Sequence, residues 1–129
     1  MKKKGIFIIG AGGHAKTCID IIESGKIFKI LCLVDKKISK DKKILNYRVI
    51  DEKIFLNQKL KKANIIVGVG QIKNPDLRKI IYNFYKKKGF KFPNIISKFS
   101  YVSKNTKLSD GILIGHGAVI NTSSKIGSN

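Results

Sequence analysis

The sequence predicts an α/β domain with a short parallel sheet, followed by the first coils of a parallel β-helix. Two patterns support this fold class. Near the N-terminus, the glycine-rich stretch GAGGHAK stands between an apolar run and a helical pattern, as expected where a strand turns into a helix beside a phosphate-bearing ligand. After Pro93, aliphatic residues recur every six positions, a period typical of β-helix repeats. We therefore expect an α/β domain over residues 1–93 and the incomplete start of a β-helix over residues 94–129.

Length and composition suit one or two small globular units. The chain has 129 residues, of which 43% are hydrophobic, and this permits a modest core. Its longest apolar stretches, IFIIG and ANIIVGVG, are far shorter than the roughly 20 residues that cross a bilayer. The two cysteines, Cys18 and Cys32, form no metal-binding motif. We expect a cytoplasmic protein with reduced thiols, no metal site and no membrane contact.

The net charge of +19 raises the question of nucleic-acid binding, because a basic surface neutralises phosphates. Nearly all of this charge is lysine, and the only arginines are Arg48 and Arg78, whereas base-reading sites favour the planar guanidinium. No stacking aromatic residues are interleaved with the lysine runs in the manner of nucleic-acid-binding proteins. We expect a solvated lysine surface and no nucleic-acid partner. An anionic small molecule remains compatible with the charge.

The first strand and helix follow from hydrophobic spacing. Ile6–Ile9 is a short β-branched run of the kind found in buried parallel strands. After the glycines, one apolar stripe at helical spacing runs up to Gly25; its members are Ala15, Cys18, Ile19 and Ile22. Ile30–Val34 forms a second strand, which ends at Asp35. The order is therefore strand, glycine turn, helix, strand.

The next segment is rich in lysine and weakly patterned. Between Lys36 and Lys62 we expect at most a short strand at Tyr47–Ile50 and a helical turn at Ile54–Leu56. Ala63–Val69 is another buried strand and ends in a second glycine turn, GVGQ.

A second helix is predicted beyond this turn. Asn74 is a candidate N-cap, and Pro75 suits the first helical position. Apolar residues at helical spacing follow, at Leu77, Ile80, Ile81 and Phe84. Gly89 ends the helix.

The hexapeptide pattern begins after Pro93. Six aliphatic anchors lie six residues apart without a slip: Ile96, Val102, Leu108, Ile114, Ile120 and Ile126. Each is followed by a small or turn-forming residue, which lets the chain turn a corner while the aliphatic side chain points into a narrow prism. An ordinary meander of short strands is the alternative, but it gives no reason for a period of six.

The glycine motif by itself leaves the ligand open. Gly10, Gly12 and Ala15 fit the G-x-G-x-x-G/A form, and Asp35 ends the next strand, where it could hold a ribose hydroxyl. A nicotinamide cofactor is the default interpretation of this pattern. The change to hexapeptides after about 90 residues argues against a dehydrogenase. His14 either packs locally at the helix start or contacts the sugar or phosphate of the ligand.

Taken together, the two halves resemble the sialic acid O-acetyltransferase family of sugar acyltransferases. The matching stretches are IFIIGAGGHAKTCIDII, LVDK, IIVGVGQ with Arg78 shortly after, KGFKFPNIIS and SYVSKNTKLSDGILIGHGAVINTSSKIG. The resemblance implies a Rossmann-like domain that binds a sugar or nucleotide-sugar acceptor. It also implies a left-handed β-helix that forms homotrimers and binds acetyl-CoA between neighbouring helices.

The resemblance also carries site residues over to this chain. The acceptor-binding motif is matched by Gly10, Gly12, Gly13, His14 and Asp35, and the second glycine turn by Gly68 and Gly70. In this family a histidine acts as general base on the acceptor, and the resemblance places it on a coil beyond Asn129, together with most of the acetyl-CoA site. His116 is a candidate substitute, but its corner of the prism differs, so we expect a solvent-facing or subunit-interface residue.

The function that follows is that of an acetyl-CoA-dependent O- or N-acetyltransferase family. Its acceptor is an amino-sugar, a nucleotide-sugar or sialic acid for bacterial surface glycans, and the chain by itself is expected to bind the acceptor without turnover. Two alternatives remain open. One is a non-catalytic nucleotide-sugar-binding fragment, and the other is an NAD-binding oxidoreductase domain.

Overall fold

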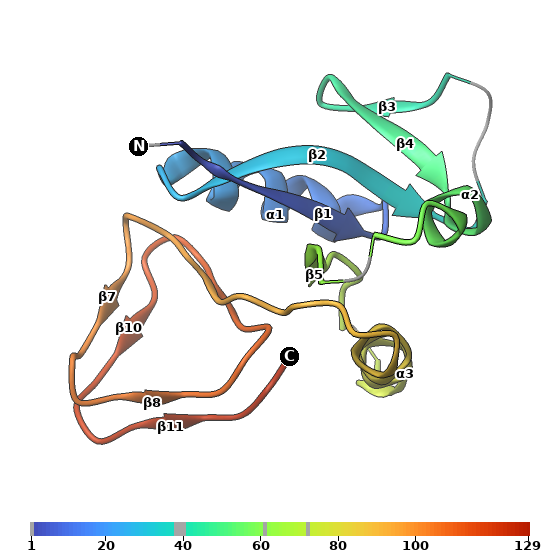
Figure 1. Cartoon of the computed structure of the whole chain (residues 1–129). Helices are drawn as coiled ribbons and strands as arrows, with labels where there is room; N and C mark the ends of the chain where they lie inside the picture. The colour runs from blue at the N-terminus through green and yellow to red at the C-terminus, as the bar shows by residue number, and fades with distance from the viewer. Residues whose placement is uncertain (1, 38–40, 61, 72) are drawn as a thin grey trace.

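The computed structural model describes residues 2–37, 41–60, 62–71 and 73–129. Its N-terminal part contains a five-stranded sheet with the order β3-β4-β2-β1-β5 (Figure 1). The strands are β1 (Lys4–Ile9), β2 (Phe28–Asp35), β3 (Lys43–Ile44), β4 (Tyr47–Asp51) and β5 (Asn64–Val67). β4, β2, β1 and β5 run parallel, while β3 is antiparallel to β4 at one edge. The prediction of an α/β fold with a short parallel sheet is therefore confirmed.

Helices cover both faces of this sheet. They are α1 (Gly13–Ser24), α2 (Glu52–Asn57) and α3 (Asp76–Lys87). Ile6 and Ile8 of β1 pack with buried residues of α1 on one face. Phe7 and Ile9 pack on the other face, with buried aromatic residues of α2 and α3. Because successive residues of a strand point to opposite faces, one continuous apolar run supplies both cores.

The lysine-rich segment contains more structure than its pattern indicates. β4 and α2 lie at the predicted short strand and helical turn, whereas residues 38–40 and 61 of this segment lie outside the described residues. Asp51 caps α2, because its Oδ1 accepts hydrogen bonds from the backbone N–H of Lys53 at 2.8 Å and of Ile54 at 3.3 Å. β3, which the sequence does not predict, forms a hairpin with β4.

α3 is present where helical spacing predicts it, with two differences. Asn74 Oδ1 accepts a hydrogen bond from the backbone N–H of Asp76 at 3.1 Å, but Pro75 occupies the N-cap position. The predicted apolar positions are largely on the outer face of α3, where Leu77, Ile80 and Phe84 are 54%, 64% and 41% exposed. The buried residues of α3 are Arg78 and Tyr85.

The hexapeptide segment forms six two-residue strands. They are β6 (Ile95–Ile96), β7 (Tyr101–Val102), β8 (Lys107–Leu108), β9 (Leu113–Ile114), β10 (Val119–Ile120) and β11 (Lys125–Ile126). β6 pairs with β9, β7 with β10 and β8 with β11, all parallel. β6, β7 and β8 thus each pair with the strand three hexapeptides further along the chain. Figure 1 shows two stacked turns with straight sides and corners between them.

Hydroxyl side chains shape the corners of the first turn. The carbonyl oxygen of Ser97 accepts hydrogen bonds from the N–H of Ser100 at 3.2 Å and from its Oγ at 2.7 Å. The carbonyl of Ser103 accepts the same pair from Thr106, at 3.1 Å and 2.6 Å. Small hydroxyl residues at this spacing close each corner locally, which explains why they recur in the pattern.

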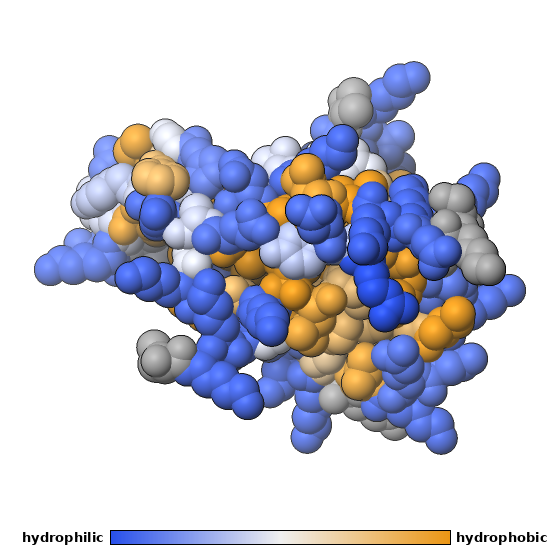
Figure 2. Space-filling view, turned by 90° about the horizontal axis from the view of Figure 1, so that it is seen from above, coloured by the Kyte–Doolittle hydropathy of each residue, from blue (hydrophilic) through white to orange (hydrophobic). Residues whose placement is uncertain are grey.

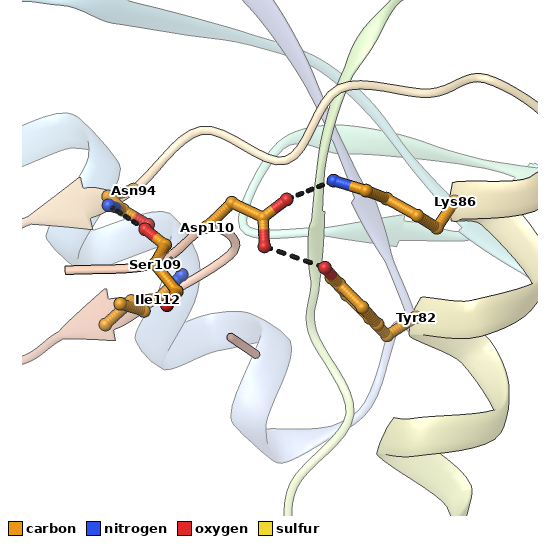
Figure 3. A network of polar contacts seen from close by, with 6 residues as sticks. All are labelled: Tyr82, Lys86, Asn94, Ser109, Asp110 and Ile112. Atoms are coloured by element: carbon orange, nitrogen blue, oxygen red, sulfur yellow. Dashed lines mark hydrogen bonds and ion pairs between the residues drawn. The ribbon is translucent and has the colours of Figure 1, made fainter. Parts of the chain in front are cut away.

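Asp110 attaches the hexapeptide segment to α3 (Figure 3). The hydroxyl of Tyr82 donates a hydrogen bond to Asp110 Oδ1 at 2.7 Å, and Lys86 forms an ion pair with Oδ2. Desolvation opposes ionisation, but hydrogen bonds from Lys86, Ser128 and Tyr82 lower the pKa of Asp110 to about 2. The carboxylate is therefore held ionised at a contact between two parts of the chain.

Asn94 and Ile95 fix the first strand of this segment. Asn94 Nδ2 donates to the carbonyl of Ser109 at 2.7 Å, and Asn94 Oδ1 accepts from the N–H of Ile112 at 3.0 Å (Figure 3). Ile95 is 3% exposed and belongs to the same core as α1. The hexapeptide segment is thus packed directly against the helix that follows the first glycine turn.

Lysine side chains dominate the surface. From above, Figure 2 shows hydrophilic side chains over most of the visible face, around a smaller hydrophobic area. Within the described ranges, salt-bridge contacts join only Lys86 to Asp110 and, where the imidazole is protonated, His116 to Asp20. The same ranges contain no helix with the length and apolar character needed to span a membrane.

Candidate functional site

A cleft of about 1090 Å³ lies at the carboxyl ends of β1, β2 and β5. β1 is flanked by β2 on one side and β5 on the other, so this edge is the point where the strand order reverses, which is where α/β sheets bind ligands. The seven residues that the family resemblance carries over all line the cleft: Gly10, Gly12, Gly13, His14, Asp35, Gly68 and Gly70.

The glycines of the two turns have different physical roles. A Cβ on Gly68 would lie 2.4 Å from Ile8 Cγ2, and a Cβ on Gly10, whose φ is +116°, would lie 2.9 Å from Val69 Cγ2. These two positions need glycine for close packing and backbone conformation. A Cβ on Gly12 or on Gly13 would meet nothing within 4 Å. Those two glycines therefore border open space, where a ligand can approach the backbone.

The N-terminus of α1 opens onto this space. Gly12 is the N-cap, it provides no side-chain hydrogen bond, and the first turn contains no acidic residue. The first N–H groups of a helix have no partner within the helix and lie at the positive end of its dipole. In this arrangement the first turn of α1 can accept a phosphate or carboxylate group of a ligand.

His14 stands on the first turn of α1, beside the second glycine turn. Its side chain is half-buried, and the position of a Cβ on Gly70 would be 3.4 Å from His14 Cβ. Burial, followed by the charge of Arg78, lowers the pKa of His14 below its usual value. The imidazole is therefore neutral at pH 7, and it can donate or accept a hydrogen bond without adding charge.

Asp35 brings a carboxylate to the cleft from the end of β2. It is the last residue of β2, and its Oδ1 accepts a hydrogen bond from the backbone N–H of Lys36 at 2.7 Å. The other carboxylate oxygen has lone pairs available for hydroxyl or N–H donors of a ligand.

Arg78 also lines the cleft, although it is not among the site residues predicted from the sequence. Its guanidinium donates from Nη1 to the carbonyl oxygens of Val67 at 3.3 Å and Val69 at 2.7 Å, and from Nη2 to Asn129 Oδ1 at 3.0 Å. Desolvation lowers its pKa, but a guanidinium stays charged in proteins. The spacing of apolar residues in α3 does not indicate that an arginine of this helix is buried. The only signal in the sequence was the position of Arg78 shortly after a glycine turn.

The hexapeptide segment supplies the second wall of the cleft. Ile112, Leu113, Ile126 and Gly127 line it from this side, together with Asn129. The backbone N–H of Asn129 donates to the carbonyl of Asp110 at 2.9 Å. A ligand in the cleft therefore lies between the glycine turns and the turns formed by β6 to β11.

His116 does not line the cleft. It occupies a corner between β9 and β10, as predicted, but its ring is bonded within the chain. Nδ1 hydrogen-bonds to Ser97 Oγ, and Nε2 lies 2.8 Å from Asp20 Oδ2 of α1. Instead of facing only solvent or another subunit, His116 links the hexapeptide segment to α1.

The cysteines take no part in this site. Cys18 and Cys32 are both buried and free, and desolvation raises the pKa of each thiol to about 11. Thiols that hold their proton so strongly are poor nucleophiles. In the part of the chain that is described, no cluster of three or more potential ligand side chains is arranged to hold a metal ion.

The fold and the site define a parallel α/β domain with a ligand cleft at two glycine turns, joined to a hexapeptide segment. The family described as the PglD N-terminal domain matches residues 5–84. The chain belongs to this family.

Solved structures extend the likeness beyond residue 84. The structure of PerB from Caulobacter crescentus, in complex with CoA and GDP-perosamine, is 27% identical with a TM-score of 0.79, over 96% of this chain and 57% of that one. A variant of the same perosamine N-acetyltransferase with one histidine replaced by asparagine is similar to the same extent, at 26% identity. The chain thus spans 57% of the length of these enzymes.

A third structure shows the fold alone. The acetyltransferase domain of PglB from Neisseria gonorrhoeae FA1090, in complex with acetyl coenzyme A, is 22% identical with a TM-score of 0.70, over 98% of this chain and 66% of that one. The family match and the Caulobacter structures support the predicted resemblance at the level of sugar acetyltransferases. Sialic acid, which the resemblance named more specifically, does not occur among the ligands of these structures.

Proposed function

We propose that the chain binds the acceptor of an acetyl-CoA-dependent sugar acetyltransferase in the cleft between its two parts. The observation that supports this best is the convergence of both glycine turns, His14 and Asp35 on one cleft at the reversal point of the sheet. The similar Caulobacter enzyme was solved with CoA and GDP-perosamine. The acceptor class is an amino-sugar, a nucleotide-sugar or sialic acid used in bacterial surface glycans.

Each cleft residue has a role in this proposal. The backbone N–H groups at Gly12 and Gly13 bind phosphate, and Asp35 accepts hydrogen bonds from sugar or ribose hydroxyls. Neutral His14 contacts the sugar or the phosphate. Gly10, Gly68 and Gly70 keep the two turns close to one another and leave room for the ligand.

The proposal also divides the chain into two domains. Residues 1–93 form a Rossmann-like acceptor domain, and residues 94–129 form the first coils of a left-handed β-helix. Parallel pairing across three hexapeptides supports the second assignment. Exposed apolar residues on the coils, Phe99, Tyr101 and Val119, support association into trimers, which sedimentation of the purified chain tests.

In the proposed reaction, the amine or hydroxyl of the acceptor attacks the thioester carbon of acetyl-CoA. A base removes the proton of the attacking group, and the CoA thiolate leaves. We do not assign this base to His116, because His116 lies outside the cleft and both of its ring nitrogens are hydrogen-bonded within the chain.

Calorimetric titration tests the binding proposal. We expect GDP, UDP or a corresponding nucleotide-sugar to bind, and Asp35→Asn to weaken that binding about tenfold, because a hydrogen bond to a charged group is lost. Asp41→Asn, the same chemical change at an exposed position, serves as the control. Binding of NADH with no binding of any nucleotide-sugar would instead support the oxidoreductase alternative.

Release of CoA in the presence of acetyl-CoA and an amino-sugar separates an enzyme from a binding module. A chain that binds the acceptor but releases no CoA acts as the non-catalytic module. If the chain turns over and His116→Ala abolishes this turnover, our conclusion that His116 is not the base would be contradicted.

A further inference from the structure

The guanidinium of Arg78 is a buried cation without an ionic partner. The residue is 7% exposed, and all three of its hydrogen bonds within the described residues go to neutral oxygens. No carboxylate in the described ranges lies within ion-pair distance of Arg78. Burial of a charge without a countercharge is costly, so a structural role alone explains this residue poorly.

Arg78 also has hydrogen-bonding capacity left. A guanidinium carries five N–H groups, and three of them are used by the acceptors named above. Nε–H and one Nη2–H have no partner among the described residues. Arg78 is one of the residues that line the cleft, so its positive charge lies beside the space that a ligand would occupy.

The charge of Arg78 reaches other groups of the cleft. It lowers the pKa of His14 on the first turn of α1, so it acts on the same region as the open helix N-terminus. Its bonds to Val67 and Val69 hold the guanidinium at the start of the second glycine turn. The guanidinium of Arg78 and the N-terminus of α1 therefore both bring positive charge to the same cleft.

We infer that Arg78 is the specificity residue that selects a diphosphate-bearing acceptor over a neutral one, and this inference rests on the proposed function. The diphosphate supplies the countercharge that the protein itself does not provide. The N–H groups at Gly12 and Gly13 offer partial positive charge to one anionic group, whereas the guanidinium adds the full positive charge that distinguishes a nucleoside diphosphate from a nucleoside or a free sugar. Charge-assisted bonds to phosphate in a desolvated site are stronger than the same bonds in water.

The test compares GDP with guanosine, and UDP with uridine, by calorimetric titration of the full chain. In the unaltered protein we expect the diphosphate to bind more tightly than the nucleoside. Arg78→Gln should weaken diphosphate binding about 10- to 100-fold while leaving nucleoside binding nearly unchanged, and Arg78→Lys should restore part of the loss. Arg48→Gln is the matched control, because it removes the same charge from an exposed strand position.

A purely structural role for Arg78 would weaken nucleoside and diphosphate binding by the same factor, and this result would overturn the inference. If Arg78→Gln does not fold, the unaltered chain still gives an answer. Inorganic pyrophosphate should shift the NMR signal of Arg78 Nε–H and leave that of Arg48 in place, and an unmoved Arg78 signal would contradict the inference. Nucleotide binding that does not respond to Arg78→Gln refutes this inference alone, whereas absence of any nucleotide binding refutes the proposed function.

Discussion

At the scale of single residues, Gly68 shows how closely the second glycine turn packs against β1. A methyl group at this position would lie 2.4 Å from Ile8 Cγ2 and 3.3 Å from the carbonyl oxygen of Ile9. We expect Gly68→Ala to lower the free energy of unfolding by about 1–3 kcal/mol, because a well-packed core has to shift to accept it. Urea denaturation measures the change.

Gly12→Ala is the control for that variant. The added methyl group meets nothing within 4 Å, and the backbone of Gly12 is extended, with φ −95°, so alanine fits without strain. Equal stability losses in the two variants would contradict the packing argument.

Spacing of glycine and aspartate was sufficient to predict residues that the fold brings together in one cleft. Gly10, Gly12 and Asp35 can be predicted from the sequence because each comes shortly after a strongly apolar run that indicates a strand. Arg78 was not predicted as a site residue, because its burial depends on contacts that form only in the folded chain, with the carbonyl group of Val67 and with Asn129, which is 51 residues away. Long-range partners of this kind leave no local pattern.

At the scale of elements, Asp110 makes the contact between α3 and the hexapeptide segment depend on pH. Its pKa is lowered to about 2 in the folded protein, from an ordinary value near 3.8. The folded state therefore gains stability from this carboxylate above about pH 4, and loses it as the pH falls toward 2.

We expect Asp110→Asn to destabilise the protein at pH 7 and to make less difference as the pH approaches 2. Unfolding curves in urea at several pH values measure this. Asp41→Asn, at an exposed position, should leave the pH dependence unchanged. An effect of Asp110→Asn that is constant from pH 7 to pH 2 would show that the ionised carboxylate contributes nothing.

The sequence predicts the elements whose apolar residues recur with a clear period, such as α3. It does not predict β3, because the turn that joins β3 to β4 lacks the residues typical of such turns. The hairpin between β3 and β4 turns at Leu45 and Asn46, with φ of 47° and 72°. Turns with two positive φ values usually contain glycine or asparagine, and leucine at the first position gives no such signal. In α3 the helix was predicted correctly, but exposed Ile80 and buried Tyr85 show that period alone does not determine the buried face.

At the scale of the whole molecule, repulsion between like charges opposes folding. The net charge is +19, and the described residues contain few ion pairs that offset it. Added salt screens such repulsion. We expect 0.5 M sodium chloride to raise Tm by roughly 3–5 °C relative to low salt.

A neutral osmolyte at the same osmolarity is the control for the salt effect, because it leaves charge interactions unscreened. A Tm that is unchanged or lower in salt would mean that the lysines are too widely spaced on the surface to repel one another.

The two walls of the cleft have a thermodynamic consequence. Ligand that contacts both the glycine turns and the side of Ile112, Leu113 and Ile126 binds only while the hexapeptide segment is docked on α1. Binding and docking are then linked equilibria, so each favours the other by the same free energy. Binding of the acceptor would therefore stabilise the docked hexapeptide segment, and it would slow the hydrogen exchange of the backbone amides in β6 and β9.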